Sequence, residues 1–407
     1  MHVLYFHQHF TTPKGASGLR SYQMARALVA AGHEATMVCG SLSNGATGLT
    51  TPFSNGRRSG VVDGINVIEF DLRYSNGDGF LTRSLAFLRY ALGSVWVAAV
   101  GKYDLVFATS TPLTAAIPGI FARWFRRKPF VFEVRDLWPE LPREMGVITN
   151  PLILSMLSLL EKLAYVSADR CIALSPGIRD GIAKRGISLN RISMIPNGCD
   201  LDIFAHGEIN IWRPDTISAK DFLATFAGTH GQANGLDAVL DVAKILKQRG
   251  RDDIKFLLVG DGKLKAQLIN RAEAESLSNV IFYPPVNKER LAGLLSASDL
   301  GLQCLANIPA FYYGTSPNKF FDYIASGLPV MCNYPGWICD LITEHDCGIA
   351  ISPDDAGAFA TALERAAQNR AALKRNGVNA ARLAQKQFDR KALAGKWVSW
   401  TAGIPEL

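Results

Sequence analysis

One short segment of the sequence places a lysine and a carboxylate where they could bind a nucleotide. The segment 316–330, SPNKFFDYIASGLPV, predicts a loop, a helix that ends at Gly327 and Pro329, and then a buried strand. The start of a helix favours anions, because its free N–H groups and its dipole carry positive charge. Lys319 lies in that first turn and Asp322 follows three residues later, so the two side chains are neighbours. We expect Lys319 to contact phosphate and Asp322 to contact ribose hydroxyls; the alternative is a solvated ion pair on an ordinary helix.

Glycine-containing loops follow several predicted strands, and glycine lets a backbone approach a ligand closely. Gly15 lies in the loop HQHFTTPKGASG after the first strand, and Arg20 follows in the first turn of a helix. GTHGQANG at 228–235 and GDG at 260–262 follow two later strands. None of these loops reads GxGxxG, and no acidic residue closes the second strand, so a nicotinamide cofactor is not expected.

The elements that must position these residues alternate between short apolar strands and helices, which predicts parallel sheets covered by helices. A stretch rich in Gly, Ser, Thr and Asn at 41–64 predicts a long mobile loop, and Trp212-Arg213-Pro214-Asp215 suggests an interdomain hinge. Ligands in such sheets bind outside the carboxyl ends of the strands. The predicted strands are HVLYF, EATMVC, INVIEF, YDLVFATS, PFVFEV and CIALS in the first half, and FLATFAG, KFLLVGDG, VIFYPP, LGLQCL, LPVMCN and GIAIS in the second.

Length and composition indicate a two-domain protein: 407 residues exceed one typical domain, and 48% hydrophobic residues suffice for two cores. No apolar run reaches the roughly 18 residues that a membrane span needs, and Met1 leads into a strand rather than a secretory signal. The seven cysteines are scattered without a CxxC pair, so we expect reduced thiols in a cytosolic protein and no metal site.

The basic excess of the chain lies in its first half. Residues 1–200 carry 21 Lys and Arg against 14 Asp and Glu, whereas residues 201–407 carry 22 of each sign. Basic residues alternate with Phe121, Trp124 and Phe125, which suits an anionic membrane surface over residues 80–100 and 121–129. Nucleic acid is not expected as a partner, because no helix-turn-helix, zinc or RNA-binding signature accompanies the charge. A merely basic exterior is the alternative.

The order of the motifs resembles that of the family 4 retaining glycosyltransferases, which have the GT-B fold. The resemblance rests on PKGASGLRSYQMARALVAAGHEATMV, FVFEVRDLWPE, ADRCIALSPGIRDGI, MIPNGCDLDIF, FAGTHGQANGLDAVL, LLVGDG and SPNKFFDYIASGLPV. It implies an α/β fold of two Rossmann-like domains with parallel sheets facing across a cleft. Residues 1–205 would form the acceptor- and membrane-facing domain, 206–385 the nucleotide-sugar domain, and 386–407 a helix that returns to the first domain. Within the family, the chain most resembles the branch typified by bacterial N-acetyl-L-fucosamine transferases of O-antigen and capsule assembly. Arg20 and Asp136 are the residues that carry this resemblance.

Several positions depart from the family pattern. The usual Gly-Gly of the first loop is Gly15-Ala16, and the usual His-Asp pair is Arg135-Asp136. Where the family usually has an Arg and a Lys that hold the diphosphate, this chain has Thr229 and Asn234. Where the family usually has two glutamates, it has Gly314 and Asp322. We expect an active enzyme rather than a dead one, because Lys319 and Arg20 can replace the lost positive charge, and Arg135 is a further candidate. Arg135 could instead pair with Glu133 or Asp136, and Asp136 could cap a helix.

The resemblance implies transfer of a sugar from a UDP-sugar to an undecaprenyl-diphosphate-linked glycan at the inner face of the cytoplasmic membrane, without a metal or other cofactor. The leaving phosphate would take the acceptor proton in a front-face mechanism. We expect an N-acetyl-6-deoxyhexose donor, with Phe311, Tyr312 and Tyr313 against its methyl or acetyl group. The expected catalytic residues are Lys319, Asp136 and Arg20, and the donor-binding residues are Gly15, Gly228, Thr229, His230, Gly231, Asn234, Gly260, Pro285, Ser316 and Asp322.

Two other functions remain open. A sugar-nucleotide 2-epimerase of the same fold would also bind a UDP-sugar and would use histidines, for which His7, His9 and His230 are candidates. A sugar-nucleotide-binding protein without strong catalysis would explain the missing motif residues. Release of UDP only in the presence of a lipid acceptor would separate a transferase from both.

Overall fold

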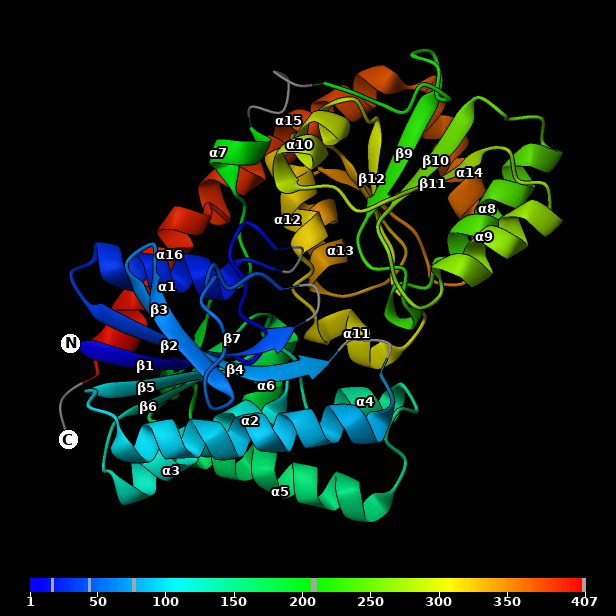
Figure 1. Ribbon diagram of the computed structural model, residues 1–407. Coiled ribbons are helices and arrows are strands. Elements are labelled where there is room, and N and C mark those ends of the chain that lie inside the picture. Colours follow the sequence, from blue (N-terminus) through cyan, green and yellow to red (C-terminus); the bar gives the residue numbers. More distant parts are fainter. Residues whose placement is uncertain (16–17, 43–44, 75–77, 206–210, 405–407) are drawn as a thin grey trace. The chain divides into compact units, whose positions relative to one another are not determined.

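The computed structural model describes residues 1–15, 18–42, 45–74, 78–205 and 211–404, which form two α/β units (Figure 1). The first unit comprises Met1–Pro196, Gly314–Ser316 and Lys391–Leu407, and the second comprises Asn197–Tyr313 and Pro317–Arg390. Each unit is built on a sheet of mainly parallel strands with helices between them. The expected fold class, two Rossmann-like α/β domains, is therefore confirmed.

The sheet of the first unit has eight strands in the order β3-β4-β2-β1-β5-β6-β7-β8, and only the pairing of β3 with β4 is antiparallel. In chain order its elements are β1 (His2–Phe6), α1 (Arg20–Ala30), β2 (Glu34–Leu42), β3 (Arg57–Val62), β4 (Ile65–Tyr74), α2 (Phe80–Val100), β5 (Leu105–Thr109), α3 (Ile117–Phe125), β6 (Phe130–Val134), α4 (Glu140–Glu144), α5 (Pro151–Ser167), β7 (Arg170–Ala173), α6 (Pro176–Lys184), β8 (Ile192–Met194) and α16 (Arg390–Ala402).

The central strands of this sheet are apolar at nearly every position because helices cover both faces. All five residues of β5 and of β6 are buried. The C-terminal helix α16 contributes to the same core, because Trp397 stacks on Tyr5 with ring centroids 5.9 Å apart and packs edge-on against Phe107 at 4.6 Å. The helices α2 and α3, and α3 and α5, are neighbours along one face of the sheet (Figure 1).

The sheet of the second unit has six parallel strands in the order β11-β10-β9-β12-β13-β14. Its elements are α7 (Leu201–Phe204), β9 (Phe222–Ala227), α8 (Asp237–Gln248), β10 (Ile254–Val259), α9 (Lys265–Ala274), β11 (Val280–Tyr283), α10 (Lys288–Ser296), β12 (Leu300–Gln303), α11 (Pro309–Gly314), α12 (Asn318–Ala325), β13 (Val330–Cys332), α13 (Trp337–Glu344), β14 (Gly348–Ala350), α14 (Ala356–Gln368) and α15 (Arg370–Gln387).

Helix α12 is fixed against the central strands of the second unit by one tyrosine. The hydroxyl of Tyr323 accepts a hydrogen bond from the Ala227 amide at 2.9 Å and donates one to the Leu302 carbonyl at 3.3 Å. Gly301 leaves room for the Tyr323 ring, because a Cβ there would lie 2.6 Å from it. The predicted order of loop, helix and strand in 316–330 is confirmed, although Pro317 lies at the N-cap rather than inside the helix.

Two features differ from the expectations drawn from sequence. The stretch 41–64 is not one long loop, because β2 extends to Leu42 and β3 pairs with β4. Strand β3 is an exposed edge strand with polar residues, so it lacks the buried apolar pattern used to find the others. The chain passes between the units after Pro196, not at the hinge expected at 212–215. Trp212 packs inside the second unit, with its ring 5.2 Å from that of Tyr283.

The strand orders place one switch point in each sheet. In the first unit the chain builds outward in opposite directions from β1 and β5, and in the second from β9 and β12. Open parallel sheets bind ligands at the carboxyl ends of the strands that flank this point. Within the described residues, no helix combines the length and the apolar character needed to cross a membrane.

Candidate functional site

Two glycine loops meet backbone to backbone at the switch point of the second unit. The Gly228 amide donates to the Val259 carbonyl at 2.9 Å, and the Gly260 amide donates to the Tyr283 carbonyl at 3.0 Å. Gly260 has a φ of 145°, and a Cβ there would lie 1.9 Å from the Gly228 carbonyl oxygen. Only glycine fits this position, because any side chain would push the two loops apart.

The predicted donor-binding amides of this loop divide into two groups. Those of Gly228 and His230 donate to backbone carbonyls of the second unit, at 2.9 Å in both cases. No group among the described residues accepts from the amides of Thr229 and Gly231. Thr229 and Gly231 are therefore the amides of this loop that can donate to a bound anion.

Lys319 reaches the same loop from the first turn of α12. Its Nζ lies 2.5 Å from Asn234 Oδ1 and 4.5 Å from the centroid of the Phe226 ring. Asn234 is itself oriented by its Nδ2, which donates to the Thr229 carbonyl at 2.7 Å. Burial lowers the pKa of Lys319 to about 8, and no carboxylate of the described ranges forms an ion pair with it. A half-buried cation without a carboxylate suits an anionic ligand.

His230 lies beneath the loop and is fully buried between two rings. Its ring centroid is 6.1 Å from those of Phe226 and Phe282. Neither ring nitrogen has a hydrogen-bond partner within the described part of the chain. Burial is the largest cause that lowers the pKa of His230, to about 4, so the imidazole is neutral at pH 7. The His230 amide donates to the Asp261 carbonyl and its carbonyl accepts from the Leu264 amide, so the residue supports the loop and does not itself face a ligand.

Asp322 has a protein partner at a second place on α12. Its Oδ1 lies 3.6 Å from Lys288 Nζ, and Lys288 also pairs with Asp200, which in turn pairs with Arg390. Burial raises the pKa of Asp322, against the opposing effect of Lys288. This four-residue network joins the predicted ribose contact to the residues that begin and end the second unit. Asp322 Oδ1 has no hydrogen-bond donor among the residues described, so it can accept one from a ligand hydroxyl.

The remaining predicted positions of the donor site lie on loops around these residues. Gly231 precedes a short 3-10 helix at Gln232–Asn234, and Pro285 is exposed shortly after β11. Ser316 lies two residues before α12, in the short stretch Gly314–Ser316 that groups with the first unit. Phe311 and Tyr312 are buried, so of the three predicted aromatic contacts only Tyr313 is exposed, at 57%.

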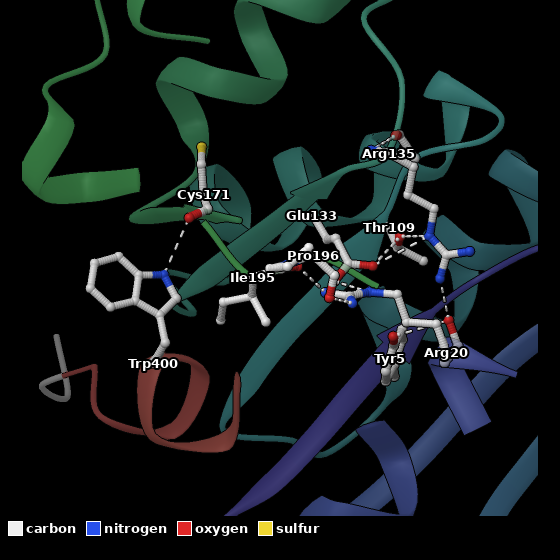
Figure 2. Close-up of polar contacts among 11 residues, drawn as sticks. Tyr5, Arg20, Thr109, Glu133, Arg135, Cys171, Ile195, Pro196 and Trp400 are labelled. Carbon is white, nitrogen blue, oxygen red and sulfur yellow. Dashed lines mark hydrogen bonds and ion pairs between the residues drawn. The ribbon is translucent and has the colours of Figure 1, made fainter. Parts of the chain in front are cut away.

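In the first unit, Arg20 is a buried clamp at the carboxyl ends of the strands (Figure 2). Its Nε and NH2 groups donate to Glu133 Oε2 at 3.0 and 2.8 Å, and NH1 donates to the Pro196 carbonyl at 2.6 Å. NH2 also donates to the Ile195 carbonyl at 2.8 Å. This geometry assigns Arg20 a positioning role, because its guanidinium already joins α1 to β6 and to the end of β8.

Arg135 shares the same carboxylate. Its Nε lies 3.3 Å from Glu133 Oε1 and donates to Thr109 Oγ1 at 2.8 Å, and its NH2 donates to Ser21 Oγ at 2.8 Å (Figure 2). Of the two ion pairs considered from sequence, the one with Glu133 is present. Burial would raise the pKa of Glu133, but Arg20 and Arg135 outweigh it and lower that pKa. The Glu133 carboxylate therefore stays ionised and forms ion pairs with both guanidinium groups.

Asp136 lies at the end of β6, where its Oδ2 accepts a hydrogen bond from Thr111 Oγ1 at 3.0 Å. It does not cap a helix, because α4 begins at Glu140 with Pro139 at its N-cap. Burial raises the pKa of Asp136. Thr111 has a φ of 82°, which is unusual for a β-branched residue. Strained backbone of this kind clusters at functional sites, so the pair is a candidate for contact with a substrate hydroxyl.

Gly15 closes a compact turn after β1. Its amide donates to the Thr12 carbonyl at 3.0 Å, and the Thr12 amide donates to the Ala46 carbonyl at 2.8 Å. A Cβ at Gly15 would lie 2.1 Å from Thr11 Oγ1. Glycine is therefore required by packing at this position, and Ala16, the second residue of the pair, lies outside the described residues.

The sequence did not point to Lys288 or Arg390 and named Glu133 only as a possible partner of Arg135, although each organises predicted site residues. Glu133 is a carboxylate inside the apolar strand FVFEV, and a charge buried in a strand is a signal in its own right. Lys288 and Arg390 had no such signal, because their partners are distant in sequence. No group of three or more metal-ligating side chains is assembled by the residues described.

Comparison with known families agrees with the motif analysis. Residues 15–198 match the Glycosyl transferase 4-like domain, and residues 209–383 match the Glycosyl transferases group 1 domain. The chain is also similar to the putative colanic acid biosynthesis glycosyl transferase WcaI of Escherichia coli K12. That similarity is 23% identity over 146 residues, so the match spans about a third of each protein, 35% of both.

Solved structures share the fold at low sequence identity. Sucrose-phosphate synthase from Thermosynechococcus elongatus has a TM-score of 0.76 and 18% identity, covering 99% of this chain and 98% of that one. Anabaena Alr3699/HepE, solved in complex with UDP-glucose, has a TM-score of 0.70 and 17% identity, covering 99% and 100%. At these identities the likeness concerns the GT-B fold alone.

Proposed function

Because the chain belongs to the glycosyltransferases, with a 4-like domain followed by a group 1 domain, we propose that it transfers a sugar from a UDP-sugar to a lipid-diphosphate-linked glycan. The similarity to a colanic acid biosynthesis transferase supports a role in assembly of a bacterial surface polysaccharide such as O-antigen or capsule. The solved complex of Alr3699/HepE with UDP-glucose supports UDP as the nucleotide.

The observation that carries the proposal is the position of Lys319 beside the glycine loop after β9. The cation, the amides of Thr229 and Gly231 and the start of α12 all lie at the switch point of the second sheet. A diphosphate there would receive one charge-assisted contact and two neutral hydrogen bonds. This arrangement compensates for Thr229 and Asn234, which stand where related enzymes have cations.

We propose a retaining transfer in which the departing diphosphate oxygen accepts the proton of the attacking hydroxyl on the same face of the sugar. The bond between the anomeric carbon and the diphosphate oxygen breaks as the bond to the acceptor oxygen forms. Lys319 and the loop amides stabilise the charge that develops on the diphosphate, which is the largest contribution such a site can make. Asp136, held by Thr111, orients a substrate hydroxyl, and no metal or other cofactor takes part.

We further propose that the first unit meets the inner face of the cytoplasmic membrane through α2, α3 and α5. Large apolar side chains are exposed along these helices, and basic residues lie among them. The structure adds α5 to the two segments expected from sequence. The exposed apolar residues are Leu81, Leu85, Leu88, Leu92, Trp96 and Val100 on α2, Trp124 and Phe125 on α3, and Leu152, Met156, Leu159, Leu163 and Val166 on α5.

The test is UDP release from UDP-sugars by the purified full-length chain, with and without a short undecaprenyl-diphosphate-linked N-acetylglucosamine acceptor in detergent. A transferase releases UDP only when donor and lipid acceptor are both present. Interconversion of the sugar without acceptor would indicate an epimerase, and UDP binding without either reaction would indicate a binding protein.

A further inference from the structure

Positively charged and histidine side chains gather at the carboxyl end of β1 in the first unit. His7 and His9 follow this strand, with ring centroids 6.2 Å apart. The His9 ring lies 6.4 Å from that of Phe87 on α2, and Arg83 Cζ lies 5.9 Å from the Phe87 centroid. Arg135, at the end of β6, is close enough to lower the pKa of both imidazoles, although burial contributes more.

The positive charge of this cluster exceeds the negative charge that the chain supplies. Glu133 is shared between Arg135 and Arg20, and Asp136 is a second carboxylate close enough for Arg135 to lower its pKa against the larger effect of burial, so Arg20, Arg83 and Arg135 face two carboxylates. Arg83 forms no ion pair within the described ranges, and its buried Nε has no hydrogen-bond acceptor there. A buried N–H donor without an acceptor is costly, and burial of unbalanced charge is more so. An anion bound here would accept from Arg83 Nε and balance the charge.

The position of the cluster is that of a binding site rather than of a structural ion pair. His7 and His9 follow β1, and Thr109 and Thr111 mark the end of β5, which are the two strands that flank the switch point of this sheet. The Nδ1 of His7 is buried and has no hydrogen-bond partner among the described residues. His7 therefore offers a second polar group for a ligand at the point where parallel sheets bind theirs.

Helix α2 joins this cluster to the apolar surface of the first unit. Arg83 and Phe87 face the end of β1, whereas Leu81, Leu85 and Leu88 are exposed on the other side of the same turns. An α-helix is about 10–12 Å across with its side chains, and Arg83 lies in the first turn of α2. A ligand with an anionic head beside Arg83 can pass its apolar chain over the start of the helix onto the exposed leucines.

We propose that Arg83, with His7, His9 and Arg135 around it, binds the diphosphate of an isoprenoid-linked acceptor, and that the exposed leucines of α2 contact the isoprenoid chain. The proposal rests on the proposed function, because it gives the acceptor of that reaction its site. Arg83 supplies the charge-assisted contact, whereas the Nε of Arg135 already contacts Glu133 and Thr109. Both guanidinium groups remain charged at any physiological pH.

The test measures binding of farnesyl diphosphate, inorganic pyrophosphate and UDP to the full-length chain by calorimetry. Arg83→Gln removes the charge, and Arg89→Gln on the exposed side of the same helix is the matched control. We expect Arg83→Gln to weaken farnesyl diphosphate about tenfold or more, because a charge-assisted contact is lost, and to leave UDP affinity within about twofold. Arg89→Gln should change neither.

A second pair of variants separates the lipid from the phosphate. Replacement of Leu81 and Leu85 by Ser should weaken farnesyl diphosphate and leave pyrophosphate unchanged, whereas Arg83→Glu should weaken both. The proposal is wrong if Arg83→Gln binds farnesyl diphosphate like the wild type, if UDP is weakened equally, or if pyrophosphate binds as tightly as the lipid. If the acceptor proposal fails in one of these ways but the wild type binds UDP, the proposed function still stands. If the wild type does not bind UDP, the acceptor proposal and the proposed function are both wrong.

Discussion

Lys319 and Asn234 form the contact on which the donor site depends: the Nζ of Lys319 lies 2.5 Å from the Oδ1 of Asn234. By the family resemblance drawn from sequence, the asparagine is expected to replace a cation, and in the structure it holds the lysine from α12 over the glycine loop. The positive charge of Lys319 thus approaches the proposed diphosphate site from helix α12 and not from the glycine loop itself. The neutral residue is a positioning group, because its amide is itself fixed by the Thr229 carbonyl.

Removal of this charge should cripple turnover without unfolding the protein. We expect Lys319→Ala to reduce kcat/KM by a factor of roughly 30 to 1000, which corresponds to about 2–4 kcal/mol of lost stabilisation of the leaving group. The melting temperature serves as the control for folding. Turnover within threefold of the wild type would show that another group holds the diphosphate.

The lowered pKa of Lys319 predicts a pH limit on donor binding. Burial lowers this pKa to about 8, so the ammonium form that binds diphosphate is lost as pH rises through that value. The affinity for UDP should fall as pH rises above about 8, where the terminal phosphate of UDP is already fully ionised. Lys319→Arg should keep its affinity into the alkaline range, because a guanidinium stays protonated. Identical pH profiles for the two proteins would contradict the assignment.

Asp322→Asn should raise the Kd for UDP while changing kcat by less than about threefold, because a ribose contact differs little between ground and transition states. The substitution also removes the charge that faces Lys288 at 3.6 Å, so the melting temperature should fall slightly. Asp340→Asn, at an exposed position of α13, is the matched control. Calorimetry that showed unchanged UDP affinity would make Asp322 a purely structural residue.

Membrane binding should depend on the exposed aromatic residues of α3. Trp124 and Phe125 are 64% and 76% exposed, so replacement of both by Ser should lower co-sedimentation with vesicles that contain anionic lipid. Val378→Ser, at an exposed apolar position of the second unit, should have no effect. Equal sedimentation of the α3 variant and the wild type would count against this surface.

Arg127 and Lys128 should add an electrostatic contribution that weakens as salt rises over the physiological range. Arg126 was grouped with them from sequence, but its guanidinium donates to the Ala99 and Gly101 carbonyls at the end of α2. Its replacement would therefore disturb the helix as well as the surface charge. Substitution of Arg127 and Lys128 alone by Ser isolates the electrostatic contribution to vesicle binding.

The sequence predicted the parts of the fold that follow from burial. Strands such as FVFEV and FLATFA are buried on both faces and stand out as apolar runs between helices. The sequence missed β3 and β8, because an exposed edge strand and a three-residue strand carry little of that pattern. It also named both Lys319 and residues of the glycine loop at 228–235 for the donor site, and the structure brings them into contact.

The sequence did not reveal which groups the side chains of Arg20 and Asp322 contact. Arg20 was expected to replace positive charge lost from the family pattern, but its guanidinium binds Glu133, 113 positions away. Asp322 was expected to serve ribose alone, and Lys288 and Asp200 were not seen as its neighbours. Long-range ion pairs leave no local pattern, so a basic residue in a loop cannot be assigned to ligand or protein from its position.

The last prediction concerns the sugar of the donor, which we propose to be an N-acetyl-6-deoxyhexose such as N-acetyl-L-fucosamine. By the family resemblance drawn from sequence, Gly314 replaces a glutamate and Arg135 replaces a histidine, two groups that are expected to meet hexose hydroxyls. Buried hydroxyls without partners cost about 1–3 kcal/mol each, so a deoxy sugar with fewer hydroxyls suits this site better. Tyr313, which is exposed next to Gly314, can pack on a methyl or acetyl group.

Competition between UDP-glucose, UDP-N-acetylglucosamine and UDP-N-acetylfucosamine at equal concentration tests this preference, and we expect the deoxy sugar to be transferred fastest. Gly314→Glu sharpens the test, because no atom of the described residues lies within 4 Å of a Cβ built at Gly314, so a side chain can begin there without a clash. The added carboxylate should shift the preference toward UDP-glucose about tenfold, since a hydroxyl that was unpaired gains an acceptor. Gly395→Glu, at an equally open position of α16, is the matched control and should leave the ratio unchanged. If the wild type uses UDP-glucose at least tenfold better than the deoxy sugar, the missing glutamate does not set the specificity.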